Sequence, residues 1–370
     1  MVVQPRVRVV VLFGGRSSEH AISCVSAGSL LRAIDRDRYD VVPIGITADG
    51  RWVEVADDPD RLTISAGVLP GVESTGSDVT LRPRAGSVIL AELGAGSGES
   101  TVDVVFPVLH GPWGEDGTVQ GLLELAGVPY VGSGVFASAA GMDKGHMKSL
   151  VVAAGLPTGA YEVVTDRQWR TDREASLARC AALAEPPGRP LFVKPARAGS
   201  SLGITRVTDL AGLAAAIDTA RLHDPKVVVE AGIENAREVE CAVLVVDGVP
   251  QASVCAEIVV RGGHDFYDFE AKYLDDAVDL VVPADLAADV EARVQRLAVA
   301  TFEALGCEGL ARVDFFVRAD GTVVLNEINT MPGFTSISMF PRMWAASGID
   351  YPTLIDLLIS DALRRGTGLR

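Results

Sequence analysis

Apolar and polar positions alternate along the first third of the chain in a pattern typical of an α/β domain. Val9–Phe13 is a continuous apolar run followed by two glycines, which predicts a buried strand leading into a turn. A helical pattern then begins near Ser17 or Ser18, either of which would cap the helix. Residues 70–101 are rich in Gly and Ser, so we expect a loop insertion there. Further strands are predicted at 39–47, 51–55 and 101–109, and a helix at 116–126 that ends at Gly127.

The remainder of the chain predicts two units with different patterns. Helical periodicity at 142–155 and 209–221 flanks a strand–loop–strand pattern at 191–207. Longer apolar strands follow, at 226–233, 237–248, 249–260 and 309–329. We therefore predict an α+β protein of three domains, with boundaries at 1–133, 134–228 and 229–370.

The composition limits the possible functions. The chain has 370 residues, of which 48% are hydrophobic and 22% charged, so it is typical of a globular protein and too long for one core. A formal net charge of −16 argues against nucleic-acid binding, although a local cluster of cations can still bind a nucleotide. Because no run of about 18 apolar residues occurs, no membrane span is predicted. The five cysteines follow no metal-binding spacing, so we expect free buried thiols in a reducing, cytoplasmic compartment.

A hairpin that carries carboxylates is the first chemical signal. The Asp-Gly pair at 320–321 is typical of a two-residue turn between two apolar strands. With that turn, Asp314 lies opposite Glu327, and Arg312 lies opposite Asn329. Two carboxylates about 5 Å apart repel each other unless a cation lies between them, and the amide of Asn329 would complete an oxygen donor set suited to Mg²⁺. The alternative is that Arg312 pairs with Asp314 or Glu327 on a solvated face.

A loop with a lysine at its entrance is the second signal. Lys194 lies inside an apolar strand, and the small residues at 199–203 let backbone N–H groups approach an anion. The Walker A pattern is absent, and a tight polar turn would explain the small residues but not the lysine. Lys144 is either a second phosphate ligand or a surface lysine of a helix. Glu230 and Glu238 suit the adenine amine and the ribose, although acids at strand ends are common.

Together these stretches resemble the D-alanine–D-alanine ligase family of the ATP-grasp superfamily. The resemblance covers nearly the whole chain and implies an ATP-grasp fold behind an N-terminal Rossmann-like domain, with ATP between the last two domains. The matching segments are LFGGRSSEHAISCVSAGSL (12–30), VLHGPWGEDGTVQGLLELAGVPYVGSG (108–134), MDKGHMKSLVVAAGLP (142–157), VKPARAGSSLGI (193–204), DFYDFEAKY (265–273) and EINTMPGFTSISMFPRMWAASGI (327–349).

The resemblance implies a two-step ligation that supplies D-alanyl-D-alanine for peptidoglycan precursors. ATP phosphorylates the carboxylate of one D-alanine, and the amine of a second D-alanine then displaces the phosphate. Asp314, Glu327 and Asn329 would hold two Mg²⁺ or Mn²⁺ ions, and a monovalent cation such as K⁺ is a further candidate. The implied nucleotide-binding residues are Lys144, Lys194, Ser200, Ser201, Glu230, Ala231, Ile233, Glu238, Phe266, Lys272 and Phe316.

The resemblance also assigns the amino-acid side of the site. Glu19 would bind the ammonium of the first D-alanine, although an acid at a helix N-terminus is also favourable without function. His110 would orient the first substrate; without the resemblance a lone strand-end histidine is more often structural. The implied substrate-binding residues are Glu19, His110, Lys272, Ser338 and Met339.

The implied catalytic residues are Glu19, Ser200, Tyr273, Arg312 and Gly333. Arg312 and the N–H of Gly333 would stabilise oxyanion charge. Ser200, Tyr273 and Glu19 would hold a loop, about residues 261–277, over the site, so that water does not reach the acyl phosphate.

Two positions depart from the family pattern, and three rival functions remain. Met339 stands where many members have Leu, and Ala231 stands where Lys often follows the first Glu, so the resemblance implies a backbone contact to adenine at Ala231. One rival is a ligase that joins a different amino or hydroxy acid, such as D-lactate, against which Glu19, Tyr273 and Ser338 together argue. A nucleotide sensor without activity would have lost metal ligands, and a kinase would not need Ser338. The family analogy implies a homodimer through the N-terminal domain.

Overall fold

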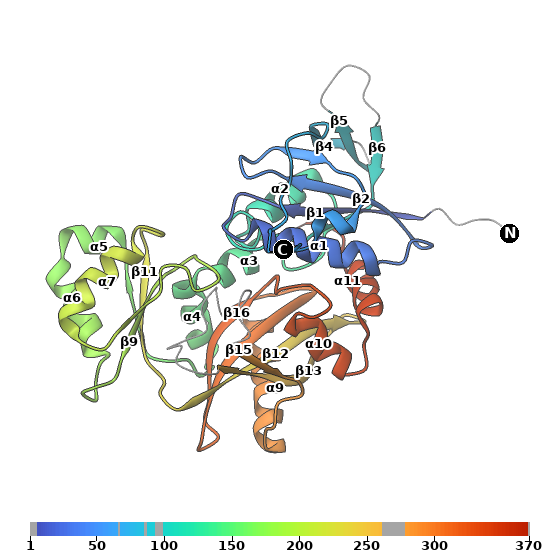
Figure 1. The fold of residues 1–370 in the computed structure, drawn as a ribbon. Coiled ribbons are helices and arrows are strands. Elements are labelled where there is room, and N and C mark those ends of the chain that lie inside the picture. Colours follow the sequence, from blue (N-terminus) through green and yellow to red (C-terminus); the bar gives the residue numbers. More distant parts are fainter. Residues whose placement is uncertain (1–5, 66, 85–86, 93–98, 261–277, 369–370) are drawn as a thin grey trace.

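The computed structural model describes residues 6–65, 67–84, 87–92, 99–260 and 278–368, arranged as in Figure 1. These residues form four β-sheets with helices packed around and between them. The mixture of helices and sheets confirms the predicted α+β class. Within the described ranges, no helix is both long and apolar enough to cross a membrane.

The N-terminal sheet is mostly parallel and is covered on both faces. Its elements are β1 (Val7–Gly14), α1 (His20–Ala33), β2 (Tyr39–Ile46), β3 (Trp52–Glu54), the 3-10 helix η1 (Pro59–Leu62), β7 (Val104–Pro107), α2 (Thr118–Ala126) and α3 (Val135–Met142). The strand order is β3-β2-β1-β7, with β1 parallel to β2 and β7. One face packs on α1 and on the last helix, α11 (Tyr351–Arg365), and the other packs on α2. The first and last segments of the chain therefore share one core.

The predicted loop insertion at 70–101 is wrong. Its described residues form a three-stranded antiparallel sheet of β4 (Val79–Arg84), β5 (Ser87–Glu92) and β6 (Glu99–Val102). The physical reason is burial, because Val79, Val88 and Leu90 pack into the core that β1 and β2 also enter. The Gly and Ser residues of this stretch predicted turns and a loop, but the apolar residues between them form strands that pack into the core.

The central sheet is antiparallel and small. Its strands are β8 (Tyr161–Val164), β9 (Leu191–Pro195), β10 (Thr205–Val207) and β11 (Val227–Ala231), in the order β10-β9-β11-β8. The helices α5 (Asp166–Thr171), α6 (Arg173–Ala182) and α7 (Leu213–Ala220) pack on it. The 3-10 helix η2 (Leu210–Gly212) leads into α7, and the helix α4 (Lys144–Ala153) precedes the sheet. Figure 1 shows α3 and α4 between this sheet and the rest of the molecule.

The C-terminal sheet has the order β14-β13-β12-β15-β16. Its elements are β12 (Ala236–Val246), β13 (Val249–Val260), β14 (Val278–Val281), α9 (Ala288–Ala304), β15 (Leu310–Arg318), β16 (Val323–Asn329) and α10 (Met339–Ala346). Helix α9 packs on one face, through Val294 and Phe302, and α10 and α11 pack on the other. The sheet therefore lies between two layers of helices.

The hairpin of β15 and β16 has the predicted pairs but a different turn. Asp314 lies opposite Glu327 and Arg312 opposite Asn329, as predicted. The two-residue turn is wrong: the N–H of Arg318 donates to Thr322, which leaves a loop at 319–321 whose glycine has φ +78°. This extra loop residue shifts the pairing by one, and a bulge opposite Asp314/Phe315 shifts it back.

Candidate active site

A cavity of about 830 Å³ lies where the three large sheets meet. Every described residue that the sequence assigned to the site lines this cavity. Phe266, Lys272 and Tyr273 lie outside the described residues. The lining residues are Glu19, His110, Lys144, Lys194, Ser200, Ser201, Glu230, Ala231, Ile233, Glu238, Arg312, Asp314, Phe316, Glu327, Asn329, Gly333, Ser338 and Met339.

The hairpin supplies one wall of the cavity with oxygen donors. Arg312 donates from Nε and Nη2 to the two carboxylate oxygens of Asp314, at 2.7 Å each, and Asn329 donates to Asp314 at 3.0 Å. Arg312 also pairs with Glu240 at 3.2 Å. Burial alone would lower the pKa of Arg312, but Asp314 and Glu240 raise it well above its usual value. The alternative interpretation is thus half correct, since the Arg312–Asp314 pair exists, but it lines a cavity rather than a solvated face.

The donor set fits a hard cation that is shared with a phosphate. Asp314, Glu327 and Asn329 offer two carboxylates and one amide oxygen from two paired strands. In the described part of the chain, no three His, Cys, Asp or Glu side chains are grouped so that they could hold a metal by themselves. Mg²⁺ commonly takes one or two carboxylates and completes its shell with water and phosphate oxygens, so these residues fit it.

Three lysines, Lys144, Lys148 and Lys194, also line the cavity. The Nζ of Lys144, at the start of α4, donates to the carbonyl of Ala198 at 2.9 Å and lies 3.6 Å from Glu327. Lys194 donates to Glu230 at 2.9 Å, and Lys148 lies 3.3 Å from the other oxygen of Glu230. Burial would raise the pKa of Glu230, yet the two ammonium groups lower it to about 2. Glu230 is therefore a carboxylate held between two cations.

Lys148 is a residue of the site that sequence reasoning missed. Its side chain is almost fully buried and lines the cavity. Burial lowers its pKa, which the neighbouring Lys194 reinforces. The signal was available: Lys148 follows Lys144 by four residues, and such positions share one face of a helix.

The loop at 196–203 contacts the N-terminal unit directly. Ser200 donates to Glu19 at 2.5 Å, which is one of the contacts that the resemblance implied. Ser200 and Ser201 both have positive φ, at 47° and 58°. A Cβ atom on Gly199 would lie 2.5 Å from the Glu19 carboxylate, so any larger residue would displace that carboxylate from its present position.

Glu19 directly precedes helix α1, which has no side-chain cap. The predicted serine cap is wrong, because Glu19 is the residue before the first helical turn and no side chain caps it. Ser17 instead donates to the carbonyl of His110 at 2.6 Å and accepts from the N–H of Glu19 at 3.2 Å. These bonds hold Glu19 beside the loop that carries His110.

His110 and Glu115 form the floor of the cavity on the same side. The Nδ1 of His110 lies 3.0 Å from the carbonyl of Met331 and must donate to it, so Nε2 accepts from Ser26. Burial lowers the pKa of His110, so it is neutral near pH 7. Glu115 accepts from the N–H of Gly111 at 2.6 Å, and burial together with Glu19 raises its pKa to about 8. Sequence reasoning also missed Glu115, since only the fold places it near Glu19.

The start of α10 closes the remaining side. Ser338 accepts from the N–H of Thr335 at 3.1 Å, and Met339 is buried. Gly333 lies against Ser338, whose Oγ would be 3.3 Å from a Cβ at that glycine. The backbone at Gly333 is therefore accessible to a ligand next to the Ser338 hydroxyl.

Comparisons with known proteins agree with this geometry. The models of the D-Ala-D-Ala ligase N-terminus and C-terminus match residues 8–133 and 150–360. The chain is 58% identical to a D-alanine–D-alanine ligase of Streptomyces griseus, over 98% of this chain and 94% of the relative. It is also 58% identical to the ligase of Nocardia farcinica, over 99% of both chains.

Solved structures give the same result. The D-alanine–D-alanine ligase of Coxiella burnetii superposes with a TM-score of 0.82 at 34% identity, over 97% of this chain and 94% of the other. The VanG D-Ala:D-Ser ligase of Enterococcus faecalis also has a TM-score of 0.82, at 36% identity over 97% and 100%. These relatives have the ATP-grasp fold, and the family is ATP-dependent. From its cavity, its two family-model matches and its full-length relatives, the chain belongs to the D-alanine–D-alanine ligase family.

Proposed function

We propose that the protein joins two D-alanine molecules to D-alanyl-D-alanine at the expense of ATP, for use in peptidoglycan precursors. The observation that carries this proposal is the cavity, which brings the phosphate-binding lysines, the carboxylate hairpin and Glu19 together. The full-length similarity to named ligases supports the same reaction. We further propose the three domains 1–133, 134–228 and 229–370.

On the nucleotide side, Lys144 and Lys194 bind the phosphates of ATP, with Ser200, Ser201 and the N–H groups of their loop. Glu230, Glu238, Ala231, Ile233 and Phe316 surround adenosine, and Lys148 holds Glu230 in its ionised form. Asp314, Glu327 and Asn329 hold two Mg²⁺ or Mn²⁺ ions, which neutralise the charge of the phosphate oxygens when bound. Phe266 and Lys272 complete this side by family analogy. A K⁺ requirement is part of the same proposal.

On the amino-acid side, Glu19 binds the ammonium of the first D-alanine and His110 orients it. The first carboxylate attacks the γ-phosphorus of ATP, which gives D-alanyl phosphate and ADP. The amine of the second D-alanine, held through Ser338, Met339 and Lys272, then attacks the acyl carbon, and phosphate leaves. Arg312 and the N–H of Gly333 stabilise the oxyanion that forms. Arg312 suits this role because its two acidic neighbours keep it charged.

We include in the same proposal the closure of a loop over the site and the assembly of the protein into a homodimer. Ser200 and Glu19 are already hydrogen-bonded, and Tyr273 joins them by family analogy so that the loop covers the site. The protein acts as a homodimer in the cytoplasm and binds neither nucleic acid nor membrane.

Product analysis tests the proposed function. Purified protein with ATP and Mg²⁺ is given D-alanine, L-alanine, D-alanine with D-serine, or D-alanine with D-lactate. We expect phosphate release coupled to D-alanyl-D-alanine, identified by mass. D-Serine is included because one structural relative is a D-Ala:D-Ser ligase. A mixed product formed in preference to D-alanyl-D-alanine would overturn the acceptor assignment but leave the ATP site intact.

A further inference from the structure

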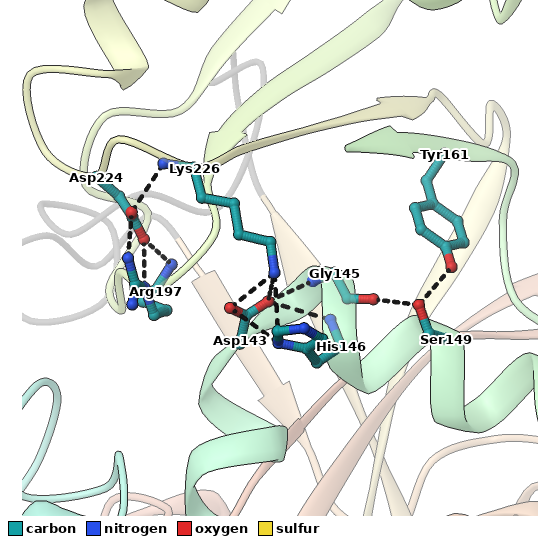
Figure 2. Close-up of polar contacts among 8 residues, drawn as sticks. All are labelled: Asp143, Gly145, His146, Ser149, Tyr161, Arg197, Asp224 and Lys226. Atoms are coloured by element: carbon teal, nitrogen blue, oxygen red, sulfur yellow. Dashed lines mark hydrogen bonds and ion pairs between the residues drawn. The ribbon is translucent and has the colours of Figure 1, made fainter. Parts of the chain in front are cut away.

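A cluster of charged residues outside the cavity connects the elements that carry the phosphate-binding lysines. We call Asp143, Lys226, Asp224 and Arg197 the Lys226 cluster, shown in Figure 2. Its members come from three places: the residue before α4, the loop after β9 and the segment before β11. None of the four was singled out by the sequence, and none lines the cavity.

Asp143 has two separate functions in this cluster. It caps α4, because its Oδ1 accepts from the N–H groups of Gly145 and His146 at 3.1 Å each. It also accepts two hydrogen bonds from the ammonium of Lys226, at 2.8 and 2.9 Å. Burial would raise the pKa of Asp143, but Lys226 and the N–H of His146 lower it below its usual value. The cap alone would not require Lys226.

The local structure is adapted to admit the Lys226 side chain. A Cβ atom on Gly145 would lie 3.2 Å from the Cε and 3.3 Å from the Nζ of Lys226, so a larger residue would crowd the lysine. Both charged side chains are largely buried, at 16% and 7% exposed. His146 lies beside the pair, with its Nδ1 3.3 Å from Asp143. Figure 2 shows the Lys226 side chain extending past Gly145 to Asp143.

The backbone of Lys226 is bonded to the phosphate loop. Its carbonyl accepts from the N–H of Ala196 at 2.9 Å, and the carbonyl of Ala196 accepts from the N–H of Lys144 at 3.0 Å. Asp224 accepts from the N–H of Lys226 and from three donors of Arg197. One residue thus contacts helix α4 through its side chain and the loop at 196–203 through its backbone.

We propose that Lys226 is a positioning residue, which holds the first turn of α4, and with it Lys144, against the loop at 196–203. The inference rests on the proposed role of Lys144 as a phosphate ligand. Without the Lys226–Asp143 pair, α4 keeps its cap but loses its side-chain link to the start of β11. Small misplacements of a binding group cost activity steeply, up to roughly 10²-fold for 1 Å.

Four single variants and the double variant Lys226→Met/Asp143→Asn test the proposal. Lys226→Met removes the charge, Lys226→Arg keeps it, and Asp143→Asn keeps the helix cap while weakening the pair. Arg221→Met is the matched control, because Arg221 forms a partly buried pair with Asp166 in the same unit but contacts no phosphate-binding element. Each protein is measured for kcat, for the KM of ATP and of D-alanine, and for its thermal midpoint.

We expect Lys226→Met and Asp143→Asn to raise the KM of ATP by about tenfold and to change the KM of D-alanine by less than about twofold. The double variant should resemble either single one, because both remove the same pair. Lys226→Arg should restore the KM of ATP. Arg221→Met should lower the thermal midpoint only. Equal KM values for ATP in Lys226→Met and Arg221→Met would overturn the proposal, as would parallel changes for both substrates.

Nucleotide binding separates this inference from the proposed function. Calorimetry with Mg²⁺ and a non-hydrolysable ATP analogue reports the phosphate site without turnover. If the wild-type protein binds the analogue but makes no dipeptide, the proposed function fails. The Lys226→Met protein would still have to bind the analogue more weakly than the wild type, and an unchanged affinity would refute the positioning role.

Discussion

The raised pKa of Glu115 leads to a quantitative prediction for the pH dependence of stability. Burial and the Glu19 carboxylate raise the pKa of Glu115 from its ordinary value of 4.5 to about 8. Between these pH values the folded protein binds a proton that the unfolded chain releases, so the free energy of unfolding falls as the pH rises. Below pH 4.5 Glu115 is protonated in both the folded and the unfolded protein. Above about pH 8 it is ionised in both, and its contribution to the free energy of unfolding is lost completely.

The magnitude follows from the same two pKa values. The whole rise in the pKa of Glu115 corresponds to at most about 5 kcal/mol in the free energy of unfolding. Because Glu115 is only partly buried and borders the cavity, solvent screening reduces this, and we expect roughly 2 kcal/mol. Glu115→Gln keeps an oxygen that can accept from the N–H of Gly111 but cannot ionise.

Urea titrations of the wild type and of Glu115→Gln at pH 5 and pH 8.5 measure this effect. The wild type should lose about 2 kcal/mol relative to the variant between the two pH values. Other titrating groups are common to both proteins and cancel in the difference. If the free energies of unfolding of the two proteins differ by the same amount at both pH values, the pKa of Glu115 is not raised by folding, and the reasoning is refuted.

Four further predictions test other parts of the site. Glu327→Gln should lower kcat by at least about 10²-fold with an unchanged circular dichroism spectrum, and an active variant would contradict its role as a metal ligand. Lys148→Met should cost about 3 kcal/mol in urea unfolding and raise the KM of ATP, because Glu230 keeps only Lys194. Gly199→Ala should raise the KM of D-alanine by roughly tenfold and the KM of ATP by less, since a Cβ would lie 2.5 Å from Glu19. The five cysteines are all free and buried, and burial raises the pKa of Cys24 and Cys307 to about 12, so a thiol reagent should label them only after unfolding.

The β15–β16 hairpin shows how far sequence reasoning extends and where it stops. The Asp-Gly pair located the turn, and period-two counting put Asp314 opposite Glu327. The counting succeeded although the loop has three residues, because the bulge compensates for the additional loop residue. A glycine can serve in either turn type, so the sequence alone does not choose between them.

Contacts between distant segments were accessible only in part. The Glu19–Ser200 bond was implied by family resemblance, whereas Lys148, Glu115 and Lys226 were overlooked. The role of each of these three residues depends on a partner far away in the sequence or on its burial, and both are set by the packing of the folded chain. Local patterns report periodicity and turns, and they do not report which charges a tertiary fold brings together.

The pairing of charges across the cavity explains why residues from separate units are needed for one site. Asp314 is paired with Arg312 within one hairpin, but Glu327 faces Lys144 of α4, and Glu230 of β11 faces Lys148 of the same helix. Glu327 and Glu230 thus connect α4 to two different sheets, and removing a lysine partner would leave a carboxylate without compensation, which costs several kcal/mol where the group is buried. The same cations and carboxylates are the groups that would bind phosphate and Mg²⁺. The charges that orient helix α4 and those that would bind the nucleotide are therefore largely the same residues. Because Lys226 also contacts the start of α4, through Asp143, we expect it to influence the binding of ATP from outside the cavity.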